Sequence, residues 1–162
     1  MSWSLHRIDD RLIHGQVLIA WGQRLRPARL WVVDEAASGN DWERDLLRSS
    51  APDHDVRVVD VAEAAAGYAE ESAAPGGAFL LVRDLATARA LAEAGVTPAR
   101  WNVGGIHYAP GRTKVHESVF LDDADRAAAR ALLARGIGLD VQDVPAARSV
   151  PLAELEPALA GS

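Results

Sequence analysis

The sequence predicts an α/β fold: a single domain with an open, mostly parallel (mixed) β-sheet and helices on both faces. Short runs rich in Val, Leu and Ile alternate with Ala-rich stretches of helical period, which is the pattern of stacked βα units. The 162 residues, 49% hydrophobic and 25% charged, suffice for one sizeable buried core. We therefore expect residues 1–162 to form one domain.

Apolar runs and turn residues place the individual elements. Strands are expected at residues 5–8, 29–33, 56–59, 79–82, 101–103 and 139–144, with an extended segment at 115–121. Helices are expected at 12–25, from a cap at Asn40 or Asp41 up to Pro52, at 62–71 and 87–94, and from 122–123 to Gly136. A short amphipathic turn is expected at 151–159.

The composition disfavours several classes of function. Lys and Arg total 17 against 23 Asp and Glu, and the net charge of −6 would repel nucleic acid and anionic lipid. The chain has no Cys, which excludes disulfides, thiolate metal sites and Cys nucleophiles. With no signal-peptide pattern and no run of membrane-spanning length, we expect a cytoplasmic protein.

Common cofactor and hydrolase motifs are also missing from the sequence. The histidines outside the first loop have no i, i+4 helical spacing and are interpreted as non-ligands: His6, His54, His107 and His116. Neither G-x-x-x-x-G-K-[ST] nor a G-x-G-x-x-G after a strand occurs, and no G-x-S-x-G turn is present. We therefore expect no metal, no nucleotide cofactor and no hydrolase triad.

The loop after the first expected strand is the strongest candidate site, because α/β sheets bind ligands at the carboxyl ends of their strands. It runs from Asp9 to Gln16 (DDRLIHGQ). The His14 imidazole could accept a phosphoryl group, whose oxygens Arg11 and the helix-entry amides could stabilise. Gly15 keeps that backbone accessible, and Asp10 is a candidate to fix the tautomer of His14.

Each of these residues has a simpler interpretation that the local sequence leaves open. A His-Gly pair at a helix start is more often solvated or capping than catalytic. Arg11 could form a surface ion pair with Asp9 or Asp10, which contributes little to stability. The Gly104-Gly105 pair after the fifth strand is, in isolation, more often a tight turn than an anion cradle.

Five segments of the sequence resemble one known family. The first, RIDDRLIHGQV from Arg7 to Val17, is similar to the signature of the IIB component of the mannose/fructose/sorbose class of the bacterial sugar phosphotransferase system (PTS). The others follow in order: Val32-Val33-Asp34, Ala51-Pro52, Asn102-Val103-Gly104-Gly105 and Val141-Gln142-Asp143-Val144-Pro145. The resemblance spans nearly the whole chain, and its first motif is highly specific.

The resemblance implies a phosphorelay without metal, nucleotide or organic cofactor. A phosphorylated IIA protein would donate to Nδ1 of His14, and the group would pass to a sugar held by the membrane IIC and IID components. Arg11 matches the family arginine that stabilises the phosphoryl group. The supporting residues implied are Asp10, Gly15, Gln16, Asp34, Gly104 and Gly105. A cytoplasmic protein associated with the permease is expected, and a homo-oligomer is left open.

The chain departs from the family pattern after Gly105. Ile106-His107-Tyr108 replaces a Met-Ser-Phe-like stretch, and Gly111-Arg112-Thr113-Lys114 replaces a Gly-Lys-Thr-Gln-like segment. We expect His107 to lie beside the site, and the sequence does not indicate which sugar is used. A regulatory phosphocarrier that reports phosphorylation state is the alternative function. A binding domain without phosphorylation is a third, against which the intact Arg11 and His14 argue.

Overall fold

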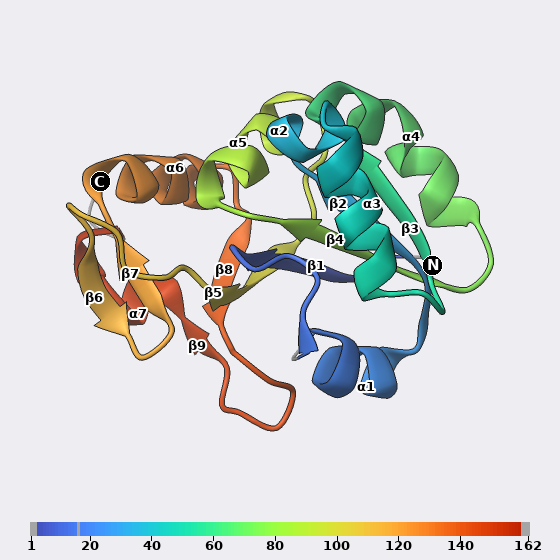
Figure 1. Ribbon diagram of the computed structural model, residues 1–162. Coiled ribbons are helices and arrows are strands. Elements are labelled where there is room, and N and C mark those ends of the chain that lie inside the picture. The colour runs from blue at the N-terminus through green and yellow to red at the C-terminus, as the bar shows by residue number, and fades with distance from the viewer. Residues whose placement is uncertain (1–2, 16, 160–162) are drawn as a thin grey trace.

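The computed structural model describes residues 3–15 and 17–159. Within this part of the chain, a seven-stranded sheet has the order β3-β2-β4-β1-β5-β8-β9, and β6 and β7 form a separate antiparallel pair (Figure 1). All neighbours in the large sheet are parallel except β8 and β9. The strands are β1 (Trp3–Asp9), β2 (Pro27–Val33), β3 (Asp55–Val59), β4 (Gly77–Val82), β5 (Arg100–Gly105), β6 (Thr113–His116), β7 (Val119–Leu121), β8 (Gly138–Val141) and β9 (Val150–Pro151).

Helices cover both faces of the large sheet, as the sequence predicts. A π-helix η1 (Val17–Gly22), α1 (Gln23–Leu25), α2 (Glu35–Ser38) and α3 (Asp41–Ser50) lie on one face. The other face carries α4 (Val61–Ala73), α5 (Leu85–Glu93), α6 (Asp123–Ala134) and α7 (Leu152–Leu155), followed by the 3-10 helix η2 (Pro157–Leu159). The open, mostly parallel mixed sheet of an α/β fold is therefore confirmed.

Strand alternation divides the buried side chains between two cores. Along β4, Phe79 and Leu81 belong to the core on the side of η1 and α3, whereas Leu80 and Val82 belong to the core on the side of α4 and α5. Successive side chains of a strand point to opposite faces, so a strand buried on both sides is apolar throughout. This is why the central strands have continuous apolar runs in the sequence.

The helix predicted at 12–25 begins later than expected. Leu12 has φ +58°, a left-handed backbone that cannot belong to an α-helix. Its amide donates to the Asp9 carbonyl at 2.9 Å, which closes a turn directly after β1. Residues 12–14 therefore form part of a loop, and the regular helix that follows is η1 and then α1.

Most other predicted boundaries shift by one to three residues, and three features differ in kind. The extended segment at 115–121 is a hairpin, in which β6 turns back onto β7. The strand expected at 139–144 ends at Val141, and the chain returns as β9. The four-residue helix α2, which the Asp34 side chain caps, was not predicted. For α3 the predicted cap is confirmed as Asn40, which accepts from the Glu43 amide at 3.0 Å.

Candidate phosphoryl-transfer site

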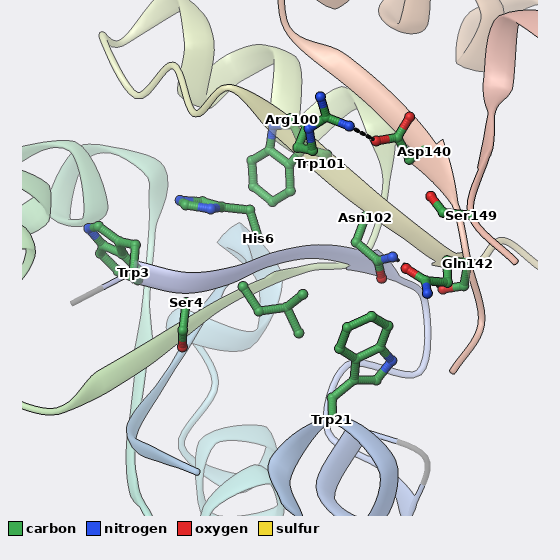
Figure 2. Close-up of a pocket in the computed structure, with 11 residues that line it drawn as sticks. Trp3, Ser4, His6, Trp21, Arg100, Trp101, Asn102, Asp140, Gln142 and Ser149 are labelled. Atoms are coloured by element: carbon green, nitrogen blue, oxygen red, sulfur yellow. Dashed lines mark hydrogen bonds and ion pairs between the residues drawn. The ribbon is translucent and has the colours of Figure 1, made fainter. Parts of the chain in front are cut away.

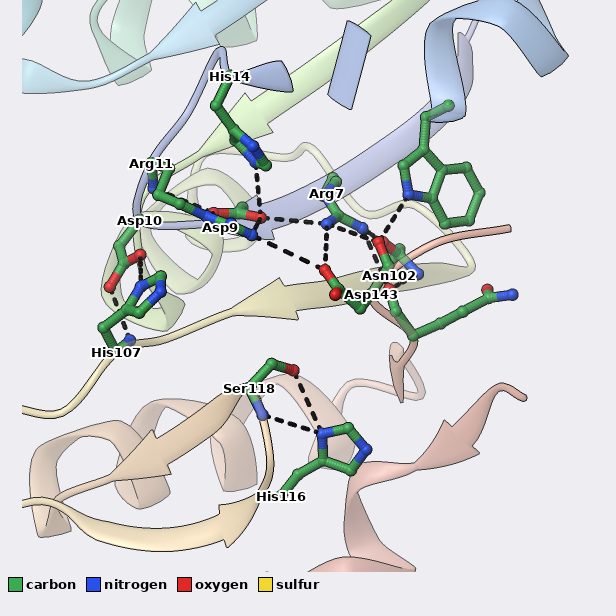
Figure 3. A network of polar contacts seen from close by, with 12 residues as sticks. Arg7, Asp9, Asp10, Arg11, His14, Asn102, His107, His116, Ser118 and Asp143 are labelled. Atoms are coloured by element: carbon green, nitrogen blue, oxygen red, sulfur yellow. Dashed lines mark hydrogen bonds and ion pairs between the residues drawn. The ribbon is translucent and has the colours of Figure 1, made fainter. Parts of the chain in front are cut away.

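The reactive loop folds back onto the last residue of β1. The Asp9 carboxylate accepts hydrogen bonds from the backbone amide and the Nε of Arg11, both at 3.0 Å. The Asp10 amide in turn donates to the Gly105 carbonyl of β5 at 3.0 Å. The turn thus places Arg11 and His14 above Asp9, at the carboxyl edge of the sheet (Figure 3).

Asp9 is the centre of the polar network. Its Oδ2 lies 3.1 Å from Arg7 Nη2, 3.0 Å from Arg11 Nη2 and 3.1 Å from His14 Nε2. Although burial by itself raises the pKa of Asp9, hydrogen bonds from Arg11 and the charges of Arg7 and His14 lower the pKa below its ordinary value of 3.8. Asp9 is therefore an ionised carboxylate that can only accept hydrogen bonds.

This contact fixes the tautomer of His14. An ionised carboxylate requires a donor, so His14 Nε2 carries the proton and the lone pair lies on Nδ1. Burial is the strongest influence on the pKa of His14 and lowers it; the Asp9 charge raises it and the Arg11 charge lowers it, with a net value below 6.5. At neutral pH the ring is uncharged, with Nδ1 as its nucleophilic atom.

Arg7 supports the network from below and is completely buried. Besides Asp9, its guanidinium donates to the Asn102 side chain on β5 and to the carbonyls of Gln142 and Asp143, at 3.1 and 2.9 Å. A Cβ at Gly104 would overlap this guanidinium, so the space for Arg7 exists only because residue 104 is glycine.

Gly104 and Gly105 lie in a strand beside charged side chains, and not in a turn. Both belong to strand β5, so the tight-turn interpretation is wrong. A Cβ at Gly105 would lie 3.3 Å from both Arg11 Nη2 and Asp9 Oδ1. Such a contact is tighter than most side chains tolerate, so the pair allows the two charged groups to pack directly against the β5 backbone.

Asp10 does not take the role expected of it. The carboxylate that contacts His14 is Asp9, whereas Asp10 binds His107 through the His107 amide at 2.8 Å and through Nδ1 at 2.5 Å. Consecutive residues at a strand end point in opposite directions, so only one of the two carboxylates can face His14. The expectation that His107 lies beside the site agrees with this Asp10 contact.

Of the other predicted site residues, Asp34 and Gly15 are placed by the structure. Asp34 caps α2 through a 3.0 Å bond to the Ala37 amide and pairs with Arg83 at 3.3 Å. Gly15 is exposed next to His14. Gln16 lies outside the described residues, and its predicted role stays a prediction. The Arg11–Asp9 ion pair, foreseen as an alternative, is present within the site itself.

No role was predicted for Arg7 or Asp143, although both lie in segments that resemble the family. A signal for Arg7 exists: it lies two residues before Asp9 in one strand, so both point to the same face. Asp143 Oδ1 lies 3.6 Å from Arg7 Nη2 and 3.8 Å from Arg11 Nη2. Only the path of the loop after β8 brings it there, and no local pattern predicts that path.

Two hollows flank the network. A groove of about 300 Å³ beside Arg11 is lined by α3 side chains, including the exposed Trp42 and Leu46, and by Arg83. A second cavity, of about 310 Å³, is lined by Asn102 and other residues of β1, β5 and β8 (Figure 2). The first borders the loop that carries His14, and the second borders the side chain that holds Arg7.

The described residues contain no group of three or more His, Cys, Asp or Glu side chains placed to hold a metal ion. None of their helices combines the length and apolar character needed to cross a membrane.

Comparison with known proteins identifies the family. A family model described as "PTS system sorbose subfamily IIB component" matches residues 3–159. The chain belongs to this family. The sorbose-specific EIIB component of Klebsiella pneumoniae is 33% identical over 151 residues, covering 93% of this chain and 92% of the relative. The mannose-specific EIIAB component of Escherichia coli (strain K12) is 37% identical over 145 residues, or 89% of this chain. The chain spans 45% of the length of that EIIAB relative.

Solved IIB structures have the same fold. The crystal structure of the IIBSor domain of the Klebsiella pneumoniae sorbose permease superposes with a TM-score of 0.89 at 31% identity, covering all of both chains. The N-acetylgalactosamine-specific IIB component 1 from Escherichia coli gives a TM-score of 0.84 at 30% identity, covering 92% of this chain and 98% of the other.

Replacement of Gly104 by alanine should disrupt the support of this IIB site. Because the new methyl group would overlap the buried Arg7 guanidinium, we expect Gly104→Ala to lower the free energy of unfolding by about 3 kcal/mol. Urea unfolding monitored by circular dichroism measures the change. Gly39→Ala is the matched control, since its methyl group would meet only ordinary contacts at 3.8 Å or more. Equal stability of the two variants would contradict the assigned role of Gly104.

Proposed function

We propose that this IIB chain is a phosphocarrier in sugar uptake. It accepts a phosphoryl group on Nδ1 of His14 from a phosphorylated IIA protein and passes it to a sugar held by the membrane IIC and IID components. The contact between His14 Nε2 and Asp9 carries the proposal, because it leaves Nδ1 as the nucleophile. Relatives named for mannose, sorbose, fructose and N-acetylgalactosamine support a monosaccharide acceptor. The protein works in the cytoplasm, peripherally bound to the permease.

The transfer step uses the side chains already described. The Nδ1 lone pair of His14 forms a bond to phosphorus while the bond to the donor breaks, and the electron pair of that bond stays with the donor. The Nε2 proton remains on His14, where the Asp9 carboxylate stabilises the growing positive charge on the ring. Arg11 Nη1 makes no hydrogen bond within the described residues, so its donors are available to the phosphoryl oxygens.

His14→Ala should abolish phosphorylation, since it removes the proposed nucleophile. Arg11→Ala should slow the transfer roughly 100- to 1,000-fold, the typical cost of losing one oriented donor at developing charge. Phosphorus NMR after incubation with a phosphorylated IIA donor detects Nδ1-phosphohistidine, and quenched-flow sampling gives the rates. Arg57→Ala, which removes an exposed arginine on β3, is the control. A phosphohistidine signal that survives in His14→Ala would disprove the site.

The protonation of His14 should follow its environment. We expect an NMR titration of the ring to give a pKa below 6.5, because burial and the Arg11 charge disfavour the imidazolium form. Phosphoryl acceptance should therefore fall as the pH is lowered through the pKa of His14, because the nucleophilic neutral form is lost, and the midpoint of that fall should lie below 6.5. In Arg11→Gln the loss of a nearby positive charge should move the titration to higher pH. A His14 pKa above 6.5 in the unaltered protein would contradict this account.

We further propose that the IIA donor docks beside the reactive loop, over the groove next to Arg11. Trp42 and Leu46 on α3 are 71% and 52% exposed, which is unusual for large apolar side chains. Arg11 and Arg83 line the same groove and would attract the phosphoryl group of an incoming donor. Apolar area beside the nucleophile, with cations at its edge, favours a partner that presents a phosphoryl group on an apolar face.

Trp42→Ala tests this docking. Because a central aromatic residue often contributes about 2 kcal/mol or more to an interface, the KM for the phosphorylated IIA donor should rise roughly 30-fold, with kcat nearly unchanged. Phosphoramidate, a small phosphoryl donor that needs no docking surface, should phosphorylate the variant and the unaltered protein at the same rate. Equal KM values for IIA in the two proteins would place the donor elsewhere.

A further inference from the structure

The carboxylate of Asp143 lies at the phosphoryl-transfer site in an unusual state. Its Oδ1 is buried and makes no hydrogen bond within the described part of the chain, although the side chain as a whole is 43% exposed. The nearest cationic groups are Arg7 Nη2 at 3.6 Å and Arg11 Nη2 at 3.8 Å. These distances exceed hydrogen-bonding range, so this oxygen acts on the site through its electric field.

The side chain of Asp143 is not what holds its loop in place. The backbone carbonyl of Asp143 accepts from Arg7 Nη2 at 2.9 Å and from Trp21 Nε1 at 3.0 Å. The neighbouring Gln142 carbonyl also accepts from Arg7. Main-chain atoms therefore anchor the loop, and the carboxylate is left for a different role.

Before phosphorylation, the groups around Asp9 carry no excess positive charge. Arg7 and Arg11 contribute two positive charges, Asp9 and Asp143 contribute two negative charges, and His14 is neutral. Asp10, which binds His107, adds a further negative charge that acts on Arg11. A phosphoryl group adds between one and a half and two negative charges at neutral pH. Phosphorylation thus brings excess negative charge into a site whose guanidinium groups are already neutralised.

We propose that Asp143 makes the phosphohistidine at His14 less stable and so keeps the phosphoryl group transferable. Its carboxylate repels the phosphoryl oxygens and competes with them for Arg11. Without it, Asp9 would be the one remaining carboxylate that pairs with Arg11 among the described residues, so Arg11 would bind the phosphoryl group more strongly and part of the free energy needed for the next transfer would be lost. Asp143 is a positioning residue that acts through Arg11 and through its field, and the inference rests on the proposed function of His14.

The test is the equilibrium between phosphorylated IIA and this protein. Asp143→Asn removes the charge and keeps the shape, so the equilibrium constant for phosphorylation of His14 should rise about 3- to 10-fold, as expected for a unit charge near a dianion in a partly solvated site. The rise should shrink at 1 M salt, which a purely structural role would not produce. Phosphorus NMR of the equilibrated mixture gives the populations. Asp143→Glu should retain most of the original value.

Two further variants complete the experiment. Asp140→Asn removes a carboxylate from β8 that pairs with Arg100 and should leave the equilibrium unchanged. Asp143→Ser provides a second uncharged side chain if Asp143→Asn does not fold. An unchanged or lower equilibrium constant in the uncharged variants, even with slower transfer, would overturn the proposal and reduce Asp143 to a support for Arg11. If the unaltered protein accepted no phosphoryl group, the proposed function would fail first, and this inference with it.

Discussion

The buried ion pair between Arg7 and Asp9 is the interaction on which the site depends. Their exposed fractions are 0% and 1%, and charges so far from water are tolerated only when they are paired and hydrogen-bonded. Arg7 meets this condition through Asn102 and through two carbonyls of the loop after β8. Asp9 meets it through Arg11 and His14. One pair therefore connects β1, β5 and the loop after β8 to the reactive imidazole.

The place of β1 in the sheet explains why this network is held so firmly. β1 pairs in parallel with β4 on one side and β5 on the other, so both of its edges are hydrogen-bonded. Helices cover both faces of the sheet, and Ile8 at the end of the strand is completely buried. The loop that carries His14 thus leaves from one of the best-anchored points of the fold, which keeps the imidazole in one geometry relative to Asp9 and Arg11.

The sequence predicts this architecture well because its signals are local. Apolar runs of strand length, and caps such as Asn40, identify most elements within a few residues. The prediction that Asp10 fixes the tautomer of His14 was wrong, because the direction in which each carboxylate points decides whether Asp9 or Asp10 contacts the ring. The alternation of β1 places Asp9 on the same face as Arg7, a signal that was available and unused. The position of Asp143 depends on a contact across three strands, which no local pattern encodes.

The left-handed backbone of Leu12 is maintained by the packing of its side chain. A leucine in this conformation is strained by about 1–2 kcal/mol, yet its side chain is 3% exposed and packs into the core beneath η1. Burial of the side chain therefore stabilises a backbone conformation that leucine otherwise disfavours. Packing of Leu12 thus fixes the turn between Asp9 and His14 within the protein itself, and the arrangement of Arg11 and His14 requires no further loss of conformational entropy in that turn.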